Sequence, residues 1–182
     1  MKNLIVLLAL CCTLQVAGNS PPAWAEVIDK IAAVLDEDLV FLSELREEAE
    51  SPVVKLLLNL DTTQNTTEDR VLPYVIERHL LLQAIQYLAP PKNQDLTMSL
   101  ALRYLSNTYH DTEAPELEQQ LEAAGISESA LETEIMPYLK GIDYIRRKYR
   151  FTADIDAPEV VLNLFQQWIN DLKAQTDIRT LL

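Results

Sequence analysis

The two histidines are the side chains best suited to metal binding or proton transfer in this sequence. His79 precedes three leucines, as is typical of a residue at a helix surface or boundary, and no second histidine stands at metal-ligand spacing from it. His110, with Asp111 and Glu113, offers three ligands in principle, but it comes where a helix is expected to end. Because the chain has so few nitrogen or sulfur ligands, we expect no metal site.

Acidic clusters and glycines give no better support for catalysis. The acidic run from Asp36 to Asp38 lacks the regular oxygen spacing of a calcium loop and is typical of a solvated turn. Of three glycines, Gly18 falls in the N-terminal leader, and Gly125 and Gly141 cannot form a phosphate-binding loop or a nucleophile elbow. The sequence therefore predicts a protein that is not an enzyme and that needs no cofactor.

A dense basic cluster, Arg146, Arg147, Lys148 and Arg150, ends the longest expected helix. One interpretation is a docking patch for acidic partners. The interpretation that we prefer is a favourable interaction of cations with the negative end of the helix, together with an ion pair between Asp143 and Arg147 at i,i+4 spacing.

The first 25 residues are typical of a cleaved secretory signal. Lys2 provides the positive start, Leu4–Leu10 is apolar, and Ala23–Ala25 forms a small-residue cleavage site. The apolar run is too short to span a membrane. Lipidation is the minor alternative, because Leu10 precedes Cys11 where a lipoprotein signal needs a small residue.

Residues 26–182 are then expected to form one domain. Both cysteines, Cys11 and Cys12, would leave with the signal, so that domain would have no disulfide, catalytic thiol or thiolate metal ligand. Its 14 basic and 28 acidic residues would give a net charge of −14. Because a polyanion repels nucleic acid and anionic lipid, we expect no nucleic-acid binding and no stable membrane insertion.

Hydrophobic periodicity predicts an all-α fold: an irregular multi-helix bundle with a small N-terminal β-hairpin, closed by the C-terminal helix. The hairpin is expected from Ile31–Leu35 and Leu39–Leu42, and Ser43 is expected to cap the helix that follows. Further helices are expected at about 53–60, 67–88, 95–109, 115–124, 129–150 and 158–176.

Prolines and caps set the expected helix boundaries. Pro52 should break the first helix. Ser129 and Glu132 have capping-box spacing for the long helix. Pro137 and Gly141 inside that helix predict a kink or a late start.

The order of these features resembles the chaperone module of SurA-type periplasmic chaperones. The resemblance covers nearly all of residues 26–182, and its residues are Ile28–Val34, Val40, Leu42–Leu45, Val75–Ile76, Leu80–Gln83, Gly125–Ile126, Ile145–Arg147, Ile155, Pro158–Val160, Trp168, Leu172, Ile178 and Leu182. Members of that family usually carry one or two parvulin-type isomerase domains before the C-terminal helix. Here Asp156 runs almost directly into that helix, and about 100 residues are missing for such a domain. The resemblance therefore implies the chaperone module without the isomerase.

This resemblance implies a periplasmic holdase of a Gram-negative bacterium, which would bind unfolded or nascent envelope and outer-membrane proteins in an apolar groove. A holdase must leave some apolar side chains uncovered, and tyrosine tolerates a half-wet groove. The candidate peptide-binding residues are Leu100, Tyr104, Tyr109, Leu121, Tyr138, Ile142 and Tyr149.

Two other functions remain open from the sequence. The alternative is an accessory subunit that grips one dedicated partner in an envelope complex. An isomerase with an unrecognised site is the least favoured function. Because the last helix completes the fold from a distance, its exchange between two copies could also give a homodimer.

Overall fold

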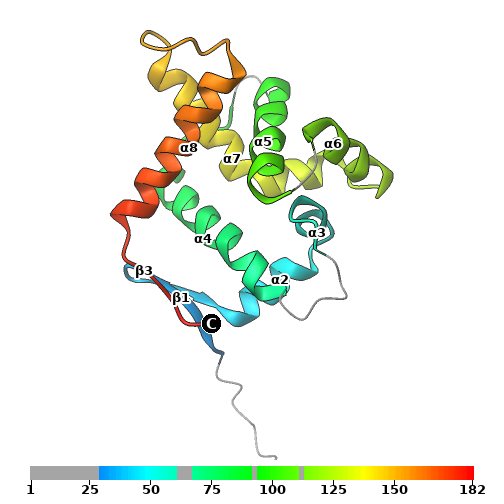
Figure 1. Ribbon diagram of the computed structural model, residues 1–182, viewed down its shortest axis with the longest axis vertical. Helices are drawn as coiled ribbons and strands as arrows, with labels where there is room; N and C mark the ends of the chain where they lie inside the picture. Colours follow the sequence, from blue (N-terminus) through cyan, green and yellow to red (C-terminus); the bar gives the residue numbers. More distant parts are fainter. Residues whose placement is uncertain (1–28, 61–66, 92–93, 111–112) are drawn as a thin grey trace, which may run out of the picture.

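The computed structural model describes residues 29–60, 67–91, 94–110 and 113–182. Figure 1 shows a bundle of helices with a small sheet at one end. In chain order the elements are β1 (Ile31–Leu35), β2 (Asp38–Phe41), α2 (Leu42–Glu50), α3 (Pro52–Leu57), α4 (Thr67–Ile85), α5 (Gln94–Tyr109), α6 (Ala114–Ala123), α7 (Glu128–Tyr149), α8 (Pro158–Gln175) and β3 (Ile178–Thr180). The predicted all-α bundle with a small N-terminal hairpin is confirmed. The predicted signal, residues 1–25, lies outside the described residues.

The sheet is antiparallel and has the strand order β2-β1-β3. In the turn after β1, Asp36 adopts a φ of 53°, a left-handed conformation that few side chains tolerate. The Asp177 N–H donates to Asp36 Oδ1 at 2.8 Å, and the Asp36 N–H donates to the Asp177 carbonyl at 3.1 Å. These bonds tie the hairpin turn to the residue before β3. Periodicity does not predict β3, because three residues are too few to show an alternation.

Of two serines near the start of the described chain, Ser51 caps a helix and Ser43 does not. Ser43 does not cap α2 as expected, because it lies inside the helix, where its N–H and its hydroxyl both donate to the Asp29 carboxylate. The predicted break at Pro52 is confirmed, since α3 begins there. Ser51 caps α3, with its Oγ accepting from the Val54 N–H at 3.4 Å.

The long helix α7 begins earlier than expected. Ser127 is its N-cap, and Ser127 Oγ accepts from the Ala130 N–H at 3.2 Å, so the predicted capping box at Ser129 is wrong. The helix then runs unbroken through Pro137 and Gly141. Neither residue delays its start or interrupts it.

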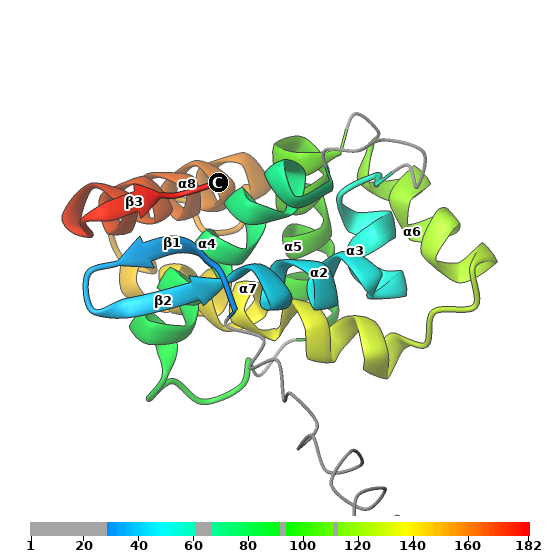
Figure 2. The ribbon, with the colours of Figure 1, turned by 90° about the horizontal axis from the view of Figure 1, so that it is seen from below.

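The central helix of the bundle is α4, which packs against α2, α7, α8 and β1. The returning helix α8 packs against α4, α5 and α7 and so closes the bundle. Figure 2 shows the sheet at one end of the molecule and α6 at the other. In the part of the chain that the structure describes, no helix is long and apolar enough to cross a membrane.

Candidate functional site

A fully buried carboxylate lies at the centre of the bundle. Glu77 of α4 has an exposed fraction of 0%. Its Oε1 accepts a hydrogen bond from the Tyr104 hydroxyl at 2.9 Å, and its Oε2 accepts from Lys173 Nζ at 2.7 Å. Because an unpaired buried charge is costly, these partners from α5 and α8 stabilise Glu77 in the core.

Tyrosines surround this buried pair. Tyr138 lies 5.9 Å from Tyr104 and 6.1 Å from Tyr74 between ring centroids, and Tyr109 packs edge-on against Tyr74 at 5.8 Å. Burial raises the pKa of the Tyr74 hydroxyl and that of the Tyr138 hydroxyl well above the usual value for tyrosine. Burial, followed by the charge of Glu77, raises the pKa of Tyr104 and Tyr109. These phenols therefore stay protonated at neutral pH and form a structural core.

Alkaline titration should reveal these buried phenols. Their folded-state pKa lies above the value of about 10 in the unfolded chain, so their contribution to stability is complete below about pH 10 and is lost as the pH rises further. We expect these four tyrosines to ionise only as tertiary structure is lost. Tyrosinate absorbance and near-ultraviolet circular dichroism, followed together, measure this. Ionisation of the four with unchanged circular dichroism would contradict it.

The structure separates the predicted peptide-binding residues. The five that are buried, each with an exposed fraction of 4% or less, are Leu100, Tyr104, Leu121, Tyr138 and Ile142. Tyr109 is half-buried and joins the tyrosine cluster, whereas Tyr149 is half-buried at the C-terminal end of α7. In this conformation these five residues offer almost no surface to a peptide, and their assignment to binding stays a prediction. Leu121 is the one of them that also lines a hollow between helices.

This hollow is part of a groove between α5, α6 and the start of α7, which we call the α5–α6–α7 groove. It consists of two adjoining cavities of about 300 and 250 Å³, which share Met98, Glu118 and Glu128. Its floor is apolar and is formed by Met98, Leu102, Leu121, Ile126 and Leu131. Met98 and Ile126 are partly exposed, so the floor is accessible from solvent.

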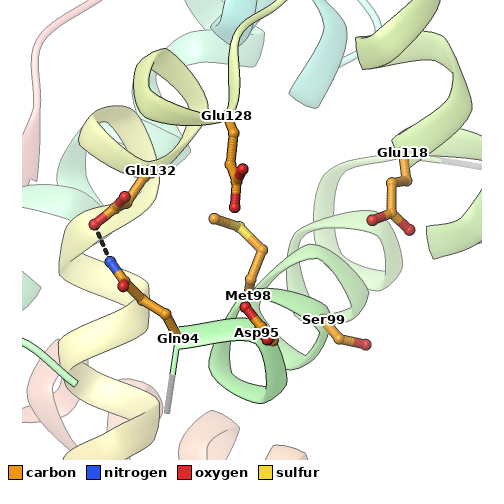
Figure 3. Close-up of a pocket in the computed structure, with 7 residues that line it drawn as sticks. All are labelled: Gln94, Asp95, Met98, Ser99, Glu118, Glu128 and Glu132. Carbon is orange, nitrogen blue, oxygen red and sulfur yellow. Dashed lines mark hydrogen bonds between the residues drawn. The ribbon is translucent and has the colours of Figure 1, made fainter. Parts of the chain in front are cut away.

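Acidic side chains form the rim of the groove. Figure 3 shows Glu132, Glu128 and Glu118 arranged around Met98. The complete rim is Asp95, Glu118, Glu122, Glu128 and Glu132. No lysine, arginine or histidine is among the residues that line the two cavities. The groove therefore joins an apolar floor to a strongly negative edge.

A glycine turn sets the shape of the groove. Gly125 ends α6 with a φ of 73°, which glycine adopts without strain. The Ile126 N–H donates to the Leu121 carbonyl at 3.1 Å, and the Gly125 N–H donates to the Glu122 carbonyl at 2.9 Å. This is the Schellman pattern, in which the residue after glycine folds back on the last helical turn. It places Ile126 beside Leu121 and directs the chain into α7.

The candidate metal ligands do not converge. His79 Nε2 lies 2.6 Å from Glu44 Oε1, and His110 is buried. Asp111, which was considered with His110, lies outside the described residues. Among the residues that the structure describes, no three His, Cys, Asp or Glu side chains are placed to hold a metal ion.

The basic cluster at the end of α7 makes local interactions. The predicted ion pair is confirmed, with Arg147 Nη2 at 2.8 Å from Asp143 Oδ2. Lys148 Nζ lies over two tyrosine rings of the same helix, and the Arg150 guanidinium lies 4.3 Å from the centre of the Phe151 ring. These contacts agree with the preferred interpretation of the cluster as a helix-end feature.

Sequence reasoning missed most of the groove. Met98 and Leu102 stand four residues apart and therefore share one face of α5, but the same helix also offers an apolar face to the core. One sequence pattern could have indicated the groove. On the two helices that follow, Glu118 and Glu122, and likewise Glu128 and Glu132, place like charges four residues apart. No protein-family model and no curated protein matches the sequence. The functional argument therefore depends on the groove and on the residue pattern.

Proposed function

We propose that this protein is a non-catalytic periplasmic chaperone, which binds unfolded or nascent envelope and outer-membrane proteins in the α5–α6–α7 groove. The observation that carries the proposal is the partly uncovered apolar floor at Met98 and Ile126. An unfolded chain gains free energy by transferring apolar side chains from water to such a floor. The resemblance of the residue pattern to SurA-type chaperones supports the same function.

The size of the groove is suited to weak capture of many different clients. Cavities of about 250 and 300 Å³ are at the lower limit of ligand pockets, so they accept one or two side chains and not a folded partner. Met98 adds a flexible thioether that can adapt to differently shaped side chains. Both features favour a holdase with many clients.

The aggregation of an unfolded outer-membrane protein tests this function. We expect residues 26–182, added near equimolar ratio, to suppress the light scattering that follows dilution from denaturant. Another acidic protein of similar size should not. The double variant Met98→Gln and Ile126→Gln should lose most of the suppression, because it makes the accessible floor polar.

A matched variant controls for the general loss of exposed apolar surface. Leu82 and Tyr87 are exposed at the end of α4 and beyond it, at 48% and 90%. The variant Leu82→Gln and Tyr87→Gln should suppress aggregation as well as the natural sequence does. Failure of the natural sequence with several clients would overturn the holdase function. Saturable capture of one envelope protein would then favour the dedicated-partner alternative.

A further inference from the structure

The five rim carboxylates of the α5–α6–α7 groove have no counter-charge among the residues that the structure describes. Some other acids of the protein form ion pairs, as do Glu48 and Glu134 with Arg78 and Glu159 with Arg103. Among the described residues, no lysine, arginine or histidine forms an ion pair with the rim acids: Asp95, Glu118, Glu122, Glu128 and Glu132. The rim is therefore a local concentration of unneutralised negative charge.

The placement of these acids is unfavourable for the helices that carry them. Glu118 and Glu122 stand at i,i+4 on α6, and Glu128 and Glu132 stand at i,i+4 on α7. Like charges at this spacing destabilise a helix. Glu122 also lies in the last turn of α6, where the helix dipole disfavours an anion and where no basic residue is present.

Helix capping accounts for only part of the rim. Asp95 and Glu128 lie in the first turns of α5 and α7, where an anion interacts favourably with the helix dipole. Glu132 accepts a hydrogen bond from the Gln94 amide of α5, whereas Glu118 and Glu122 have no such explanation. Local cost without a structural gain is typical of functional positions, and here the acids border an apolar floor.

We propose that the groove selects client segments in which an apolar side chain is flanked by lysine or arginine. This inference rests on the proposed function, because it assigns the client class of the same groove. The apolar side chain would bury itself against Met98 and Ile126, and the flanking cations would lie along the acidic rim. Cations there relieve the repulsion within each glutamate pair, which an acidic or neutral segment cannot do.

The expected preference is modest and depends on salt. Each exposed ion pair contributes about 0.2–1 kcal/mol, so two or three of them give roughly a tenfold difference in Kd. Salt screens charges at the rim, whereas it leaves burial in the floor intact. Selection should therefore weaken at high ionic strength while binding of the apolar side chain persists.

Three fluorescent peptides test this inference by anisotropy. They share a leucine–phenylalanine–leucine centre and carry lysine, serine or glutamate on both flanks. We expect the lysine peptide to bind about tenfold more tightly than the serine peptide at low salt, and the glutamate peptide to bind most weakly. The triple variant Glu118→Gln, Glu122→Gln and Glu128→Gln, which we call the rim variant, should bind the three peptides with similar affinities. Its affinity for the serine peptide should stay unchanged.

A control with the same change in net charge separates the rim from the whole molecule. Glu47, Glu50 and Asp171 are exposed on α2 and α8, outside the groove. The variant Glu47→Gln, Glu50→Gln and Asp171→Asn should keep the preference for the lysine peptide. If this control loses as much of the preference as the rim variant does, the net charge of the whole protein is responsible and the inference is overturned.

The outcomes also separate this inference from the proposed function. Equal binding of all three peptides contradicts selection by charge but leaves the chaperone function intact. Absence of binding to every peptide, together with undiminished aggregation of unfolded clients, contradicts both. Unfolding in urea gives a second readout, because Glu118→Gln together with Glu122→Gln removes a like-charge pair and an anion at the C-terminal end of α6 and should make the protein slightly more stable. A loss of stability would show that the acids serve the fold.

Discussion

Replacement of Lys173 by methionine is expected to lower the free energy of unfolding by about 3 kcal/mol. Glu77 is completely buried, and Lys173 Nζ lies 2.7 Å from its Oε2. The variant keeps most of the aliphatic packing of the lysine but leaves the carboxylate without its counter-charge. We place the loss at the lower end of the range for buried pairs, because the Lys173 side chain is 35% exposed. Urea unfolding at neutral pH, followed by circular dichroism, measures it.

Removal of the acidic partner should lower the free energy of unfolding much less. In Glu77→Gln the amide oxygen can still accept from Tyr104, and Lys173 can extend its ammonium group into water. We expect a loss of about 1 kcal/mol, similar to that of one hydrogen bond. The exposed lysine Lys30 provides the control, since Lys30→Met should have almost no effect. Equal losses for Glu77→Gln and Lys173→Met would contradict the argument.

Replacement of Gly141 by valine should also destabilise the fold strongly, by about 3 kcal/mol. At this point α7 approaches α8 so closely that a Cβ atom would lie 2.7 Å from Phe165 Cε2 and 3.1 Å from Trp168 Cζ3. Phe165 cannot move easily, because it is fully buried and packs edge-on against Tyr104 at 4.8 Å. Thermal and urea unfolding of the variant measure the loss.

Two further variants identify the cause. Ala130→Val introduces the same β-branched side chain at an exposed position of α7 and should cost only its lower helix propensity, a few tenths of a kcal/mol. Gly141→Ala should also lower the free energy of unfolding, because the clash of the new Cβ costs more than the gain in helix propensity. Adding Phe165→Leu to this variant should recover part of the lost stability. Absence of coupling between positions 141 and 165 would show that close packing is not the reason for the glycine.

Local signals predicted most of the fold because they act within a few residues. Pro52 starts α3 and Gly125 ends α6. The strand β3 and the burial of Glu77 depend on contacts between distant parts of the chain. β3 pairs with β1 about 140 residues earlier, and Glu77 obtains its partners from α5 and α8. A helix pattern does not reveal such partners, so Glu77 reads as an ordinary surface acid.

The site was less predictable than the fold for a related reason. Tyr104 and Met98 stand on the same helix, and both are suited to a groove or to a core. The neighbouring helices decide between these roles: α7 and α8 cover Tyr104, whereas α6 leaves Met98 partly open. Only Leu121 of the predicted set lines the groove described here. The acidic pairs on α6 and α7 were missed because one sequence does not show that they face one groove.

Site-specific crosslinking tests most directly whether clients bind in the α5–α6–α7 groove. Residues 26–182 contain no cysteine, so Met98→Cys, Ile126→Cys and the control Leu82→Cys can each carry one photoreactive probe. With an unfolded outer-membrane protein as client, we predict several-fold more crosslinked product from positions 98 and 126 than from position 82. An excess of unlabelled client should compete it away. Equal yields at all three positions, or a higher yield at position 82, would contradict the groove as the client-binding site.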